Sequence, residues 1–261
     1  MNRPERRPTL VIAHGAWHRP ASWAATCDAL AERGYETRVP ALPSAGYPAP
    51  TGSMYDDADV IRKAVTGIDG PVAVLAHSYG GIPATQGTAG AAGVSHLIYL
   101  TAYLLDEGES VFSFHGREAP SDTSGTFRLL RNPRVALYHD IADEPAARAL
   151  DQLVKQSLRS FTDKVTSVAW RHIPSTYVLC EDDRAIPLAL QERMAARATA
   201  SRRIAGGHSP FLAAPRRFAA VIDEILRSAS AAAARPPLPS AGCPAGTGLR
   251  TVGPVSSPRP D

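Results

Sequence analysis

Short, continuous apolar runs alternate along the chain with longer segments whose apolar residues recur every three or four positions. The runs Thr9–Ala13 and Ser175–Cys180 are typical of strands buried on both faces. Ala58, Ile61 and Val65 instead follow the spacing of one helix face. Strands separated by helices predict an α/β fold around a mainly parallel sheet. We predict six strands, at 9–13, 35–39, 71–76, 95–101, 175–180 and 201–205, and helices at 21–33, 55–66, 80–90, 187–198 and 215–233.

The connection between the fourth and fifth predicted strands, residues 104–171, is too long for an ordinary crossover. Its pattern is helical in places, notably at 144–158, so we expect a helical cap over the functional site. Its large apolar side chains either line a pocket or pack the cap onto itself, and we expect a mixture of the two. These side chains are Phe112, Phe114, Phe127, Leu129, Leu130, Tyr138, Phe161 and Trp170.

The final segment, residues 229–261, is rich in proline, alanine and glycine and has no periodic apolar face. Such a composition is typical of a disordered tail. We therefore predict one domain over residues 1–228, interrupted by the cap, followed by this tail.

Composition narrows the possible functions. The 261 residues suffice for one sizeable core, and 28 basic against 25 acidic residues give a net charge of +3 with no long basic run. This distribution argues against nucleic acid as a partner. With only three cysteines, no disulfide framework is expected. The sequence contains no run of eighteen apolar residues, so no membrane-spanning helix is expected. A cytoplasmic protein that does not bind membranes is expected.

The strongest chemical signal is Ala76-His77-Ser78-Tyr79-Gly80, directly after the third predicted strand and before a helix. A sharp turn from strand to helix strains its central residue and projects a serine hydroxyl above the sheet edge. The pattern is G-x-S-x-G with alanine in the first glycine position. By itself it is also compatible with an ordinary turn.

A nucleophilic serine needs an imidazole to accept its proton and a carboxylate to orient that imidazole. Three adjacent carboxylates, Glu181, Asp182 and Asp183, follow the fifth predicted strand, and Asp182 is the main rival of Asp183. His208 follows the last strand on a pair of glycines. Because the carboxyl ends of parallel strands share one edge, these groups are expected beside Ser78. Spacing alone leaves both aspartates open for the acid role.

An oxyanion hole needs two backbone amides aimed at one point. The first predicted strand ends in the loop 14–18, whose Ala16 amide is one candidate, and the Tyr79 amide is the other. His14 and His77 flank these loops. We expect both to hydrogen-bond the backbone rather than to take part in chemistry.

The chain resembles the α/β-hydrolase superfamily, and within it the compact group that contains plant methyl esterases of the salicylate-binding type, hydroxynitrile lyases and bacterial relatives. The resemblance implies that the acid is Asp183, three residues before the Ile-Pro pair, and that Ala16 and Tyr79 are the oxyanion donors. The residues that carry it are His14-Gly15-Ala16-Trp17-His18, Trp23, His77-Ser78-Tyr79-Gly80-Gly81, Leu100-Thr101-Ala102-Tyr103, Cys180 to Pro187 and Gly207 to Leu212.

Two positions bear on the reaction. The lyases of this group resemble one another in carrying threonine at the position of Gly15 and lysine directly after the catalytic histidine. This chain has Ser209 after His208. The resemblance therefore implies the esterase-like branch.

We accordingly predict a carboxylesterase-like serine hydrolase that acts without a cofactor or metal on a small apolar ester or related acyl compound, as a monomer or homodimer. Two alternatives remain: a non-hydrolytic tailoring enzyme with the same triad (lyase, cyclase or acyl transferase), and a catalytically silent ligand-binding protein. The predicted site comprises catalytic Ser78, Asp183 and His208, oxyanion donors Ala16 and Tyr79, and substrate contacts Trp17, Tyr103 and Phe211.

Overall fold

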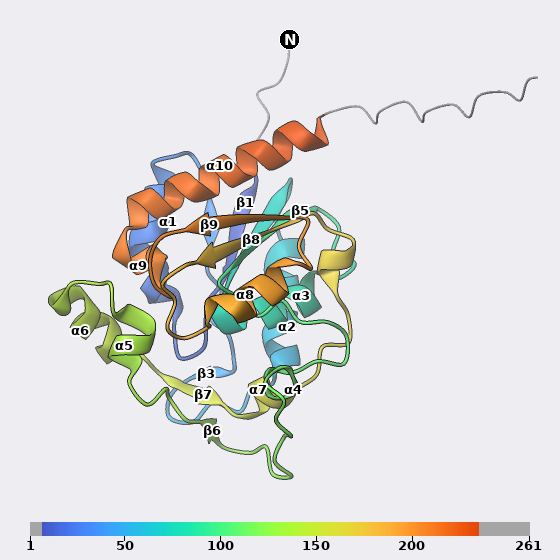
Figure 1. Cartoon of the computed structure of the whole chain (residues 1–261). Coiled ribbons are helices and arrows are strands. Elements are labelled where there is room, and N and C mark those ends of the chain that lie inside the picture. The colour runs from blue at the N-terminus through green and yellow to red at the C-terminus, as the bar shows by residue number, and fades with distance from the viewer. Residues whose placement is uncertain (1–6, 235–261) are drawn as a thin grey trace, which may run out of the picture.

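A six-stranded sheet forms the centre of the protein, and every pair of neighbouring strands is parallel (Figure 1). The computed structural model describes residues 7–234. The strand order is β2-β1-β4-β5-β8-β9. The strands are β1 (Thr9–Ala13), β2 (Thr37–Arg38), β4 (Val72–His77), β5 (Val94–Leu100), β8 (Ser175–Cys180) and β9 (Ala200–Ile204). The predicted α/β architecture with six strands in the main sheet is confirmed.

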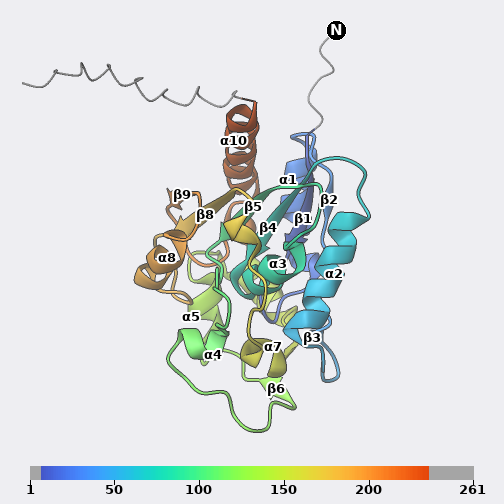
Figure 2. The ribbon, with the colours of Figure 1, turned by 90° about the vertical axis from the view of Figure 1, so that its right-hand side faces the viewer.

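Helices cover both faces of this sheet, giving three layers (Figure 2). Leu10 and Ile12 of β1 belong to a buried cluster with Phe218 of α10, whereas Val11 belongs to a second cluster with Ile61 of α2. Successive side chains of a strand point to opposite faces, so each face of the sheet has its own core. One face carries α1 (Ala24–Ala31), α9 (Pro210–Ala213) and α10 (Pro215–Ala233), and the other α2 (Met54–Thr66), α3 (Gly81–Thr88) and α8 (Leu188–Ala195).

The element boundaries agree best where the sequence signal is local. β1, β8 and α10 have the predicted bounds. α2 begins at a capping box in which the Ser53 hydroxyl accepts from the Asp56 amide and the Asp56 carboxylate accepts from the Ser53 amide. The predicted strand 35–39 is wrong in length, because β2 has only two residues. Pro40, which has no amide hydrogen to continue the ladder, follows soon after.

The long connection contains strands as well as helices, which corrects the expectation of a helical insertion. Its β7 (Lys155–Ser157) pairs antiparallel with β6 (Thr126–Phe127) and with β3 (Ala45–Gly46), which precedes the insertion in sequence. The predicted helix 144–158 is therefore shorter, because its last residues pair as a strand. The helices of the connection are α4 (Val111–Phe114), α5 (Pro133–Tyr138), α6 (Asp143–Asp151) and α7 (Arg159–Thr162).

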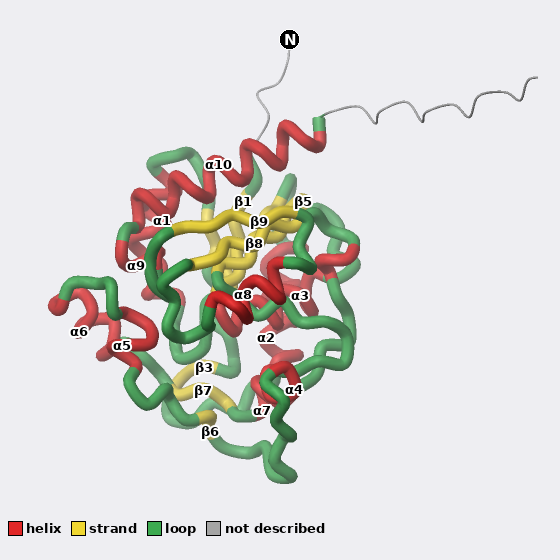
Figure 3. The backbone as a smooth tube through the Cα atoms, in the orientation of Figure 1, coloured by secondary structure: helices red, strands yellow, loops and turns green. Residues whose placement is uncertain are grey.

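The insertion is mostly loop, and it lies beyond the carboxyl ends of the parallel strands (Figure 3). At the other end of the molecule α10 continues to Ala233, so the predicted boundary at 229 falls inside a helix. The rest of the predicted tail lies outside the described residues. None of the helices within residues 7–234 is long and apolar enough to cross a bilayer.

Candidate active site

Ser78 occupies a strained turn at the end of β4. Its φ is 53°, in the left-handed region that side-chain-bearing residues rarely adopt. The two residues after Tyr79 must be glycines, because neighbouring backbone leaves no room for a side chain. A Cβ on Gly80 would lie 2.3 Å from the Ala13 carbonyl oxygen, and a Cβ on Gly81 would lie 2.3 Å from the Tyr103 carbonyl oxygen. This is the strand–turn–helix context that exposes a nucleophilic hydroxyl.

His208 is paired with Asp183 in a buried arrangement. His208 Nδ1 lies 2.7 Å from Asp183 Oδ2, and the Thr101 hydroxyl donates to the same oxygen at 2.5 Å. The other carboxylate oxygen accepts from the amides of Ala185 and Ile186 at 2.6 and 2.9 Å. Both carboxylate oxygens are thus held by donors, which leaves the carboxylate one orientation toward the imidazole.

Asp182 has a different environment. Its side chain is exposed and accepts from the amide of Gly206 at 3.2 Å. Burial by itself raises the pKa of Asp183, but the charge and hydrogen bond of His208, with the donors described above, outweigh burial and hold that pKa below its usual range. The structure therefore brings Asp183, and not Asp182, to the imidazole.

The imidazole lies beside the serine turn. The ring of His77, the residue before Ser78, is 4.7 Å from the ring of His208 between centroids, and His77 Nε2 is 2.9 Å from the His208 carbonyl oxygen. Within residues 7–234 the Ser78 hydroxyl and the His208 ring do not form a hydrogen bond. In free enzymes such catalytic bonds are often long and tighten when substrate binds.

The loop after β1 passes directly against this turn. A Cβ on Gly15 would lie 2.8 Å from His77 Nδ1 and 3.1 Å from Ser78 Cβ. Ala16 and Tyr79 are both buried, and neither backbone amide donates a hydrogen bond to another residue in the described part of the chain. The two amides predicted to form an oxyanion hole thus come from adjoining loops and are not engaged by protein acceptors.

Three further histidines surround the site as neutral rings. His14 Nδ1 and His18 Nδ1 lie 3.0 and 2.8 Å from the carbonyl oxygens of Gly15 and Ala16. Burial lowers the pKa of His14 to about 4 and of His18 to about 3, and it holds that of His77 well below the ordinary value. The expectation that His14 and His77 hydrogen-bond the backbone is confirmed.

These rings predict acid sensitivity of the fold. In the unfolded chain each imidazole takes a proton below its ordinary pKa of 6.5, whereas the folded chain keeps His14 neutral to about pH 4. The unfolded state then binds more protons, so stability falls as pH drops from 6.5 toward 4. Between pH 7 and pH 5 His14 and His18 are each expected to remove about 2 kcal/mol of unfolding free energy, measured by urea denaturation, and His77 acts in the same direction.

Asp57 has the opposite effect on stability, because burial raises its pKa to about 6 and the folded chain then takes up a proton between pH 7 and pH 5. This uptake restores only about 1 kcal/mol of the unfolding free energy that the histidines remove. Replacing His14 by Gln is expected to reduce the difference between pH 7 and pH 5. The control His172→Gln, at an exposed position, is expected to leave it unchanged. Equal stability of the wild type at both values would contradict the assignment.

Aromatic residues of the insertion pack on the same loops. Trp17 lies 6.2 and 5.8 Å from the rings of Phe127 and Phe161, and Tyr79 lies 5.4 Å from Phe161. The insertion also reaches the His208 loop, where the Gly207 amide donates to Asp140 at 2.6 Å. Residues of the insertion thus contact the loops around Ser78 and His208 as well as one another.

The three predicted substrate contacts occupy different environments. Trp17 is in the aromatic group just described, and Tyr103 is half-buried with its hydroxyl 2.8 Å from His115 Nε2. Phe211 has no exposed surface, because its ring stacks on Trp23 with centroids 4.1 Å apart and an interplanar angle of 7°. Phe211 therefore offers no accessible surface to a ligand and acts as a core residue beside His77.

Thr101 is a site residue that the sequence analysis missed. Its φ of 35° places it in a turn at the end of β5, from which its hydroxyl reaches Asp183. A threonine that ends a buried strand next to the serine-bearing strand was the available signal.

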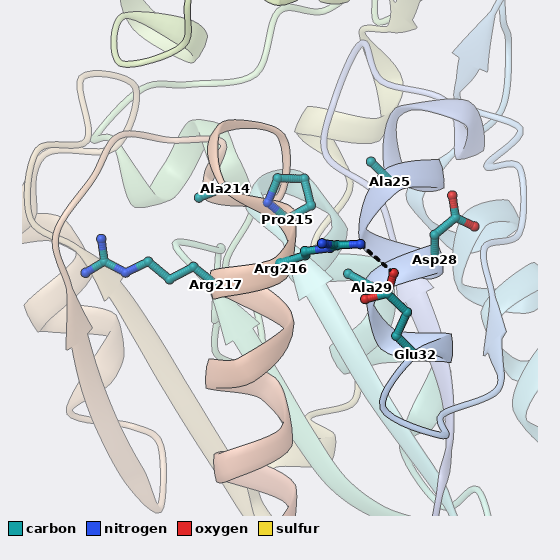
Figure 4. A pocket seen from close by; sticks show the side chains of 8 residues that line it. All are labelled: Ala25, Asp28, Ala29, Glu32, Ala214, Pro215, Arg216 and Arg217. Atoms are coloured by element: carbon teal, nitrogen blue, oxygen red, sulfur yellow. Dashed lines mark hydrogen bonds and ion pairs between the residues drawn. The ribbon is translucent and has the colours of Figure 1, made fainter.

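A separate groove of about 530 Å³ lies between α1 and α10, on the outer face of the molecule (Figure 4). An ion pair spans the groove, with Arg216 Nη2 2.8 Å from Glu32 Oε1. Both side chains are largely exposed, so this ion pair contributes little stability. Its lining residues include none of the groups described above.

Comparisons with known proteins identify the family of the chain. A family model described as the alpha/beta hydrolase family matches residues 10–221. The chain is 30% identical over 233 residues to the alpha/beta hydrolase nvfD of Aspergillus novofumigatus, covering 80% of this chain and 92% of that protein.

Two solved structures share the fold. A pyrethroid hydrolase from Sphingobium faniae JZ-2 is 23% identical with a TM-score of 0.72, covering 86% of this chain and 99% of the other. The methylesterase MES16 from Arabidopsis is 18% identical with a TM-score of 0.72, covering 85% and 99%. With the matched family model and the fold in agreement, the chain belongs to the α/β-hydrolase family.

Proposed function

We propose that this protein is a serine hydrolase that cleaves a carboxylic ester of a small apolar substrate through an acyl-enzyme. The observation that carries the proposal is the buried pair of His208 and Asp183 beside the strained turn of Ser78. An ordinary turn serine needs neither the strain nor an imidazole oriented by a carboxylate.

In the proposed mechanism the Ser78 hydroxyl attacks the substrate carbonyl while His208 Nε2 accepts its proton. Asp183 keeps the other proton on Nδ1 and stabilises the imidazolium that forms. His208 then protonates the leaving alcohol and afterwards activates water, which releases the acid. The Ala16 and Tyr79 amides stabilise the oxyanion, each by about 3 kcal/mol.

The side chains around the site support the substrate class that we propose. Trp17 is joined by Phe127 and Phe161 of the insertion, and aromatic surfaces favour an apolar substrate part. The names of two structural neighbours, a pyrethroid hydrolase and a methylesterase, accord with ester chemistry on this fold. A small apolar ester is therefore the substrate class that we propose.

Steric space argues against the lyase alternative. The lyases that the chain resembles carry threonine at the position of Gly15, where a Cβ would lie 2.8 Å from His77 Nδ1 in this backbone. Lysine, which they carry after the catalytic histidine, is replaced by Ser209, whose hydroxyl is buried. Hydrolysis is the reaction that these two positions favour.

The proposal is tested by hydrolysis of short-chain aryl and methyl esters in ¹⁸O-labelled water, combined with a fluorophosphonate probe. We expect one ¹⁸O atom in the acid product and a phosphonate adduct on Ser78, because labelling requires an activated serine. Product formed without ¹⁸O would favour a lyase, cyclase or transferase. Absence of both turnover and labelling would favour a ligand-binding protein.

A further inference from the structure

Asp57 of α2 is a buried carboxylate outside the triad. It has no exposed surface, and its Oδ2 accepts from the Tyr79 hydroxyl at 2.6 Å and from the Ser44 hydroxyl. Its Oδ1 accepts from the Ser44 amide at 2.9 Å. A buried carboxylate thus holds the side chain of Tyr79, whose backbone amide is one of the two proposed oxyanion donors.

Gln156 of β7 is likewise buried and hydrogen-bonded, beside the loop 14–18 that carries Ala16. It has no exposed surface, and its amide nitrogen donates to the hydroxyls of Ser44 and Ser160 at 2.7 and 2.9 Å. Its carbonyl oxygen accepts from the backbone amide of Trp17 at 3.2 Å. Ser44 is therefore bonded to both Asp57 and Gln156 and joins them into one network.

The peptide that Gln156 holds is strained. Trp17 directly follows Ala16 and has a φ of 62°, which a tryptophan adopts only when its surroundings impose it. Its amide is bonded to Gln156, and its carbonyl oxygen accepts from the amide of Val154 at 2.8 Å. Residues of the insertion thus hold both polar groups of Trp17. The Trp17 amide belongs to the Ala16–Trp17 peptide, which directly follows the Gly15–Ala16 peptide that carries the Ala16 amide, so these bonds restrain the loop on one side of that amide.

We propose that Asp57 and Gln156 are positioning residues that hold the Tyr79 and Ala16 amides in register as one oxyanion hole. The inference rests on the proposed function, because it concerns the transition state of that reaction. Oxyanion donors contribute only when they are aimed at the position of the developing charge, so small displacements are costly to the rate.

If the network only stabilised the fold, its loss would lower stability without a specific loss of kcat. Removing a buried hydrogen bond lowers stability wherever the bond lies. Loss of oxyanion alignment lowers kcat and the affinity for a transition-state analogue together, and it leaves KM nearly unchanged. The chain offers a matched control in Tyr99, a buried tyrosine whose hydroxyl is 2.8 Å from that of Thr85, outside this network.

The experiment compares Tyr79→Phe with Tyr99→Phe on an aryl ester. We expect Tyr79→Phe to lower kcat about 10-fold or more, to change KM less than about 2-fold, and to weaken binding of a trifluoromethyl ketone by the same factor as kcat. Tyr99→Phe is expected to lower the melting temperature similarly while keeping kcat within about 2-fold of the wild type.

Gln156→Met provides a second variant should Tyr79→Phe fail to fold, and the same loss of kcat is expected. Its control is Ser160→Ala, which removes one partner of Gln156 and keeps the bond to Trp17. If Tyr79→Phe and Gln156→Met retain the kcat of their controls, the positioning role is refuted and the proposed function stands. An inactive wild type, or an active Ser78→Ala variant, refutes both.

Discussion

Replacement of Ser78 by alanine is expected to lower kcat for an ester by about 10⁴-fold or more, because it removes the only atom that can form the acyl-enzyme in the proposed mechanism. The fold is expected to persist. The substitution deletes one oxygen from a partly exposed side chain and leaves the backbone of the turn unchanged. Steady-state kinetics and thermal unfolding measure the two effects separately.

Ser95→Ala is the matched control for this experiment. Ser95 lies at the amino end of β5, at the opposite edge of the same sheet, and its hydroxyl donates to the Val72 carbonyl at 3.0 Å. This variant is expected to retain full activity and to react with the fluorophosphonate probe. Ester cleavage at the normal rate by Ser78→Ala would mean that another group is the nucleophile.

The second large effect is expected at Asp183. In Asp183→Asn the side chain keeps its size, but its amide group can donate to His208 Nδ1 and so favours the wrong tautomer of the imidazole. We expect kcat to fall by about 10⁴-fold, the loss typical of this change in serine triads. The measurement is kcat on the same ester, together with the rate of fluorophosphonate labelling.

Asp182→Asn removes the same charge one residue away and serves as the control. Asp182 is exposed and accepts only from the Gly206 amide among the described residues. A change of less than about 3-fold is expected, as for surface substitutions generally. If Asp182→Asn caused the greater loss, the acid role would move to Asp182 and the pairing of His208 with Asp183 would not be the working arrangement.

The predictions that succeeded depend on local signals. The continuous apolar runs of β1 and β8 predicted their bounds correctly, and the helical spacing of Ala58, Ile61 and Val65 predicted α2 to within one residue. The turn at Ser78 was predictable because a buried strand, a serine and two glycines follow one another within a few residues. These signals need no knowledge of distant contacts.

The expectations that were wrong depend on such contacts. Residues 155–157 were predicted as the end of a helix, but they pair with β3 and β6 from either side and form β7 instead. Phe211 follows the His208 loop in sequence and was expected at the substrate, yet the ring of Trp23 stacks on it. In both cases partners distant in sequence decide the outcome, and tertiary packing overrides local preference.

The network of Asp57, Ser44 and Gln156 was also beyond the sequence. Asp57 sits in the first turn of α2, where an acidic residue is ordinary because it favours the positive end of the helix. Only the fold places its carboxylate beneath Tyr79, and only the pairing of β7 brings Gln156 to Trp17.

The sequence by itself determined the layered architecture and the chemical groups available, because periodicity and turn residues act over a few positions along the chain. Spacing alone left Asp182 and Asp183 open, and the family resemblance implied Asp183. Tertiary structure decided which carboxylate meets the imidazole, and it decided how the insertion holds the loop after β1. Hydrogen bonds and ring contacts form over a few ångströms in space, and no local pattern reports which distant residues come within that range.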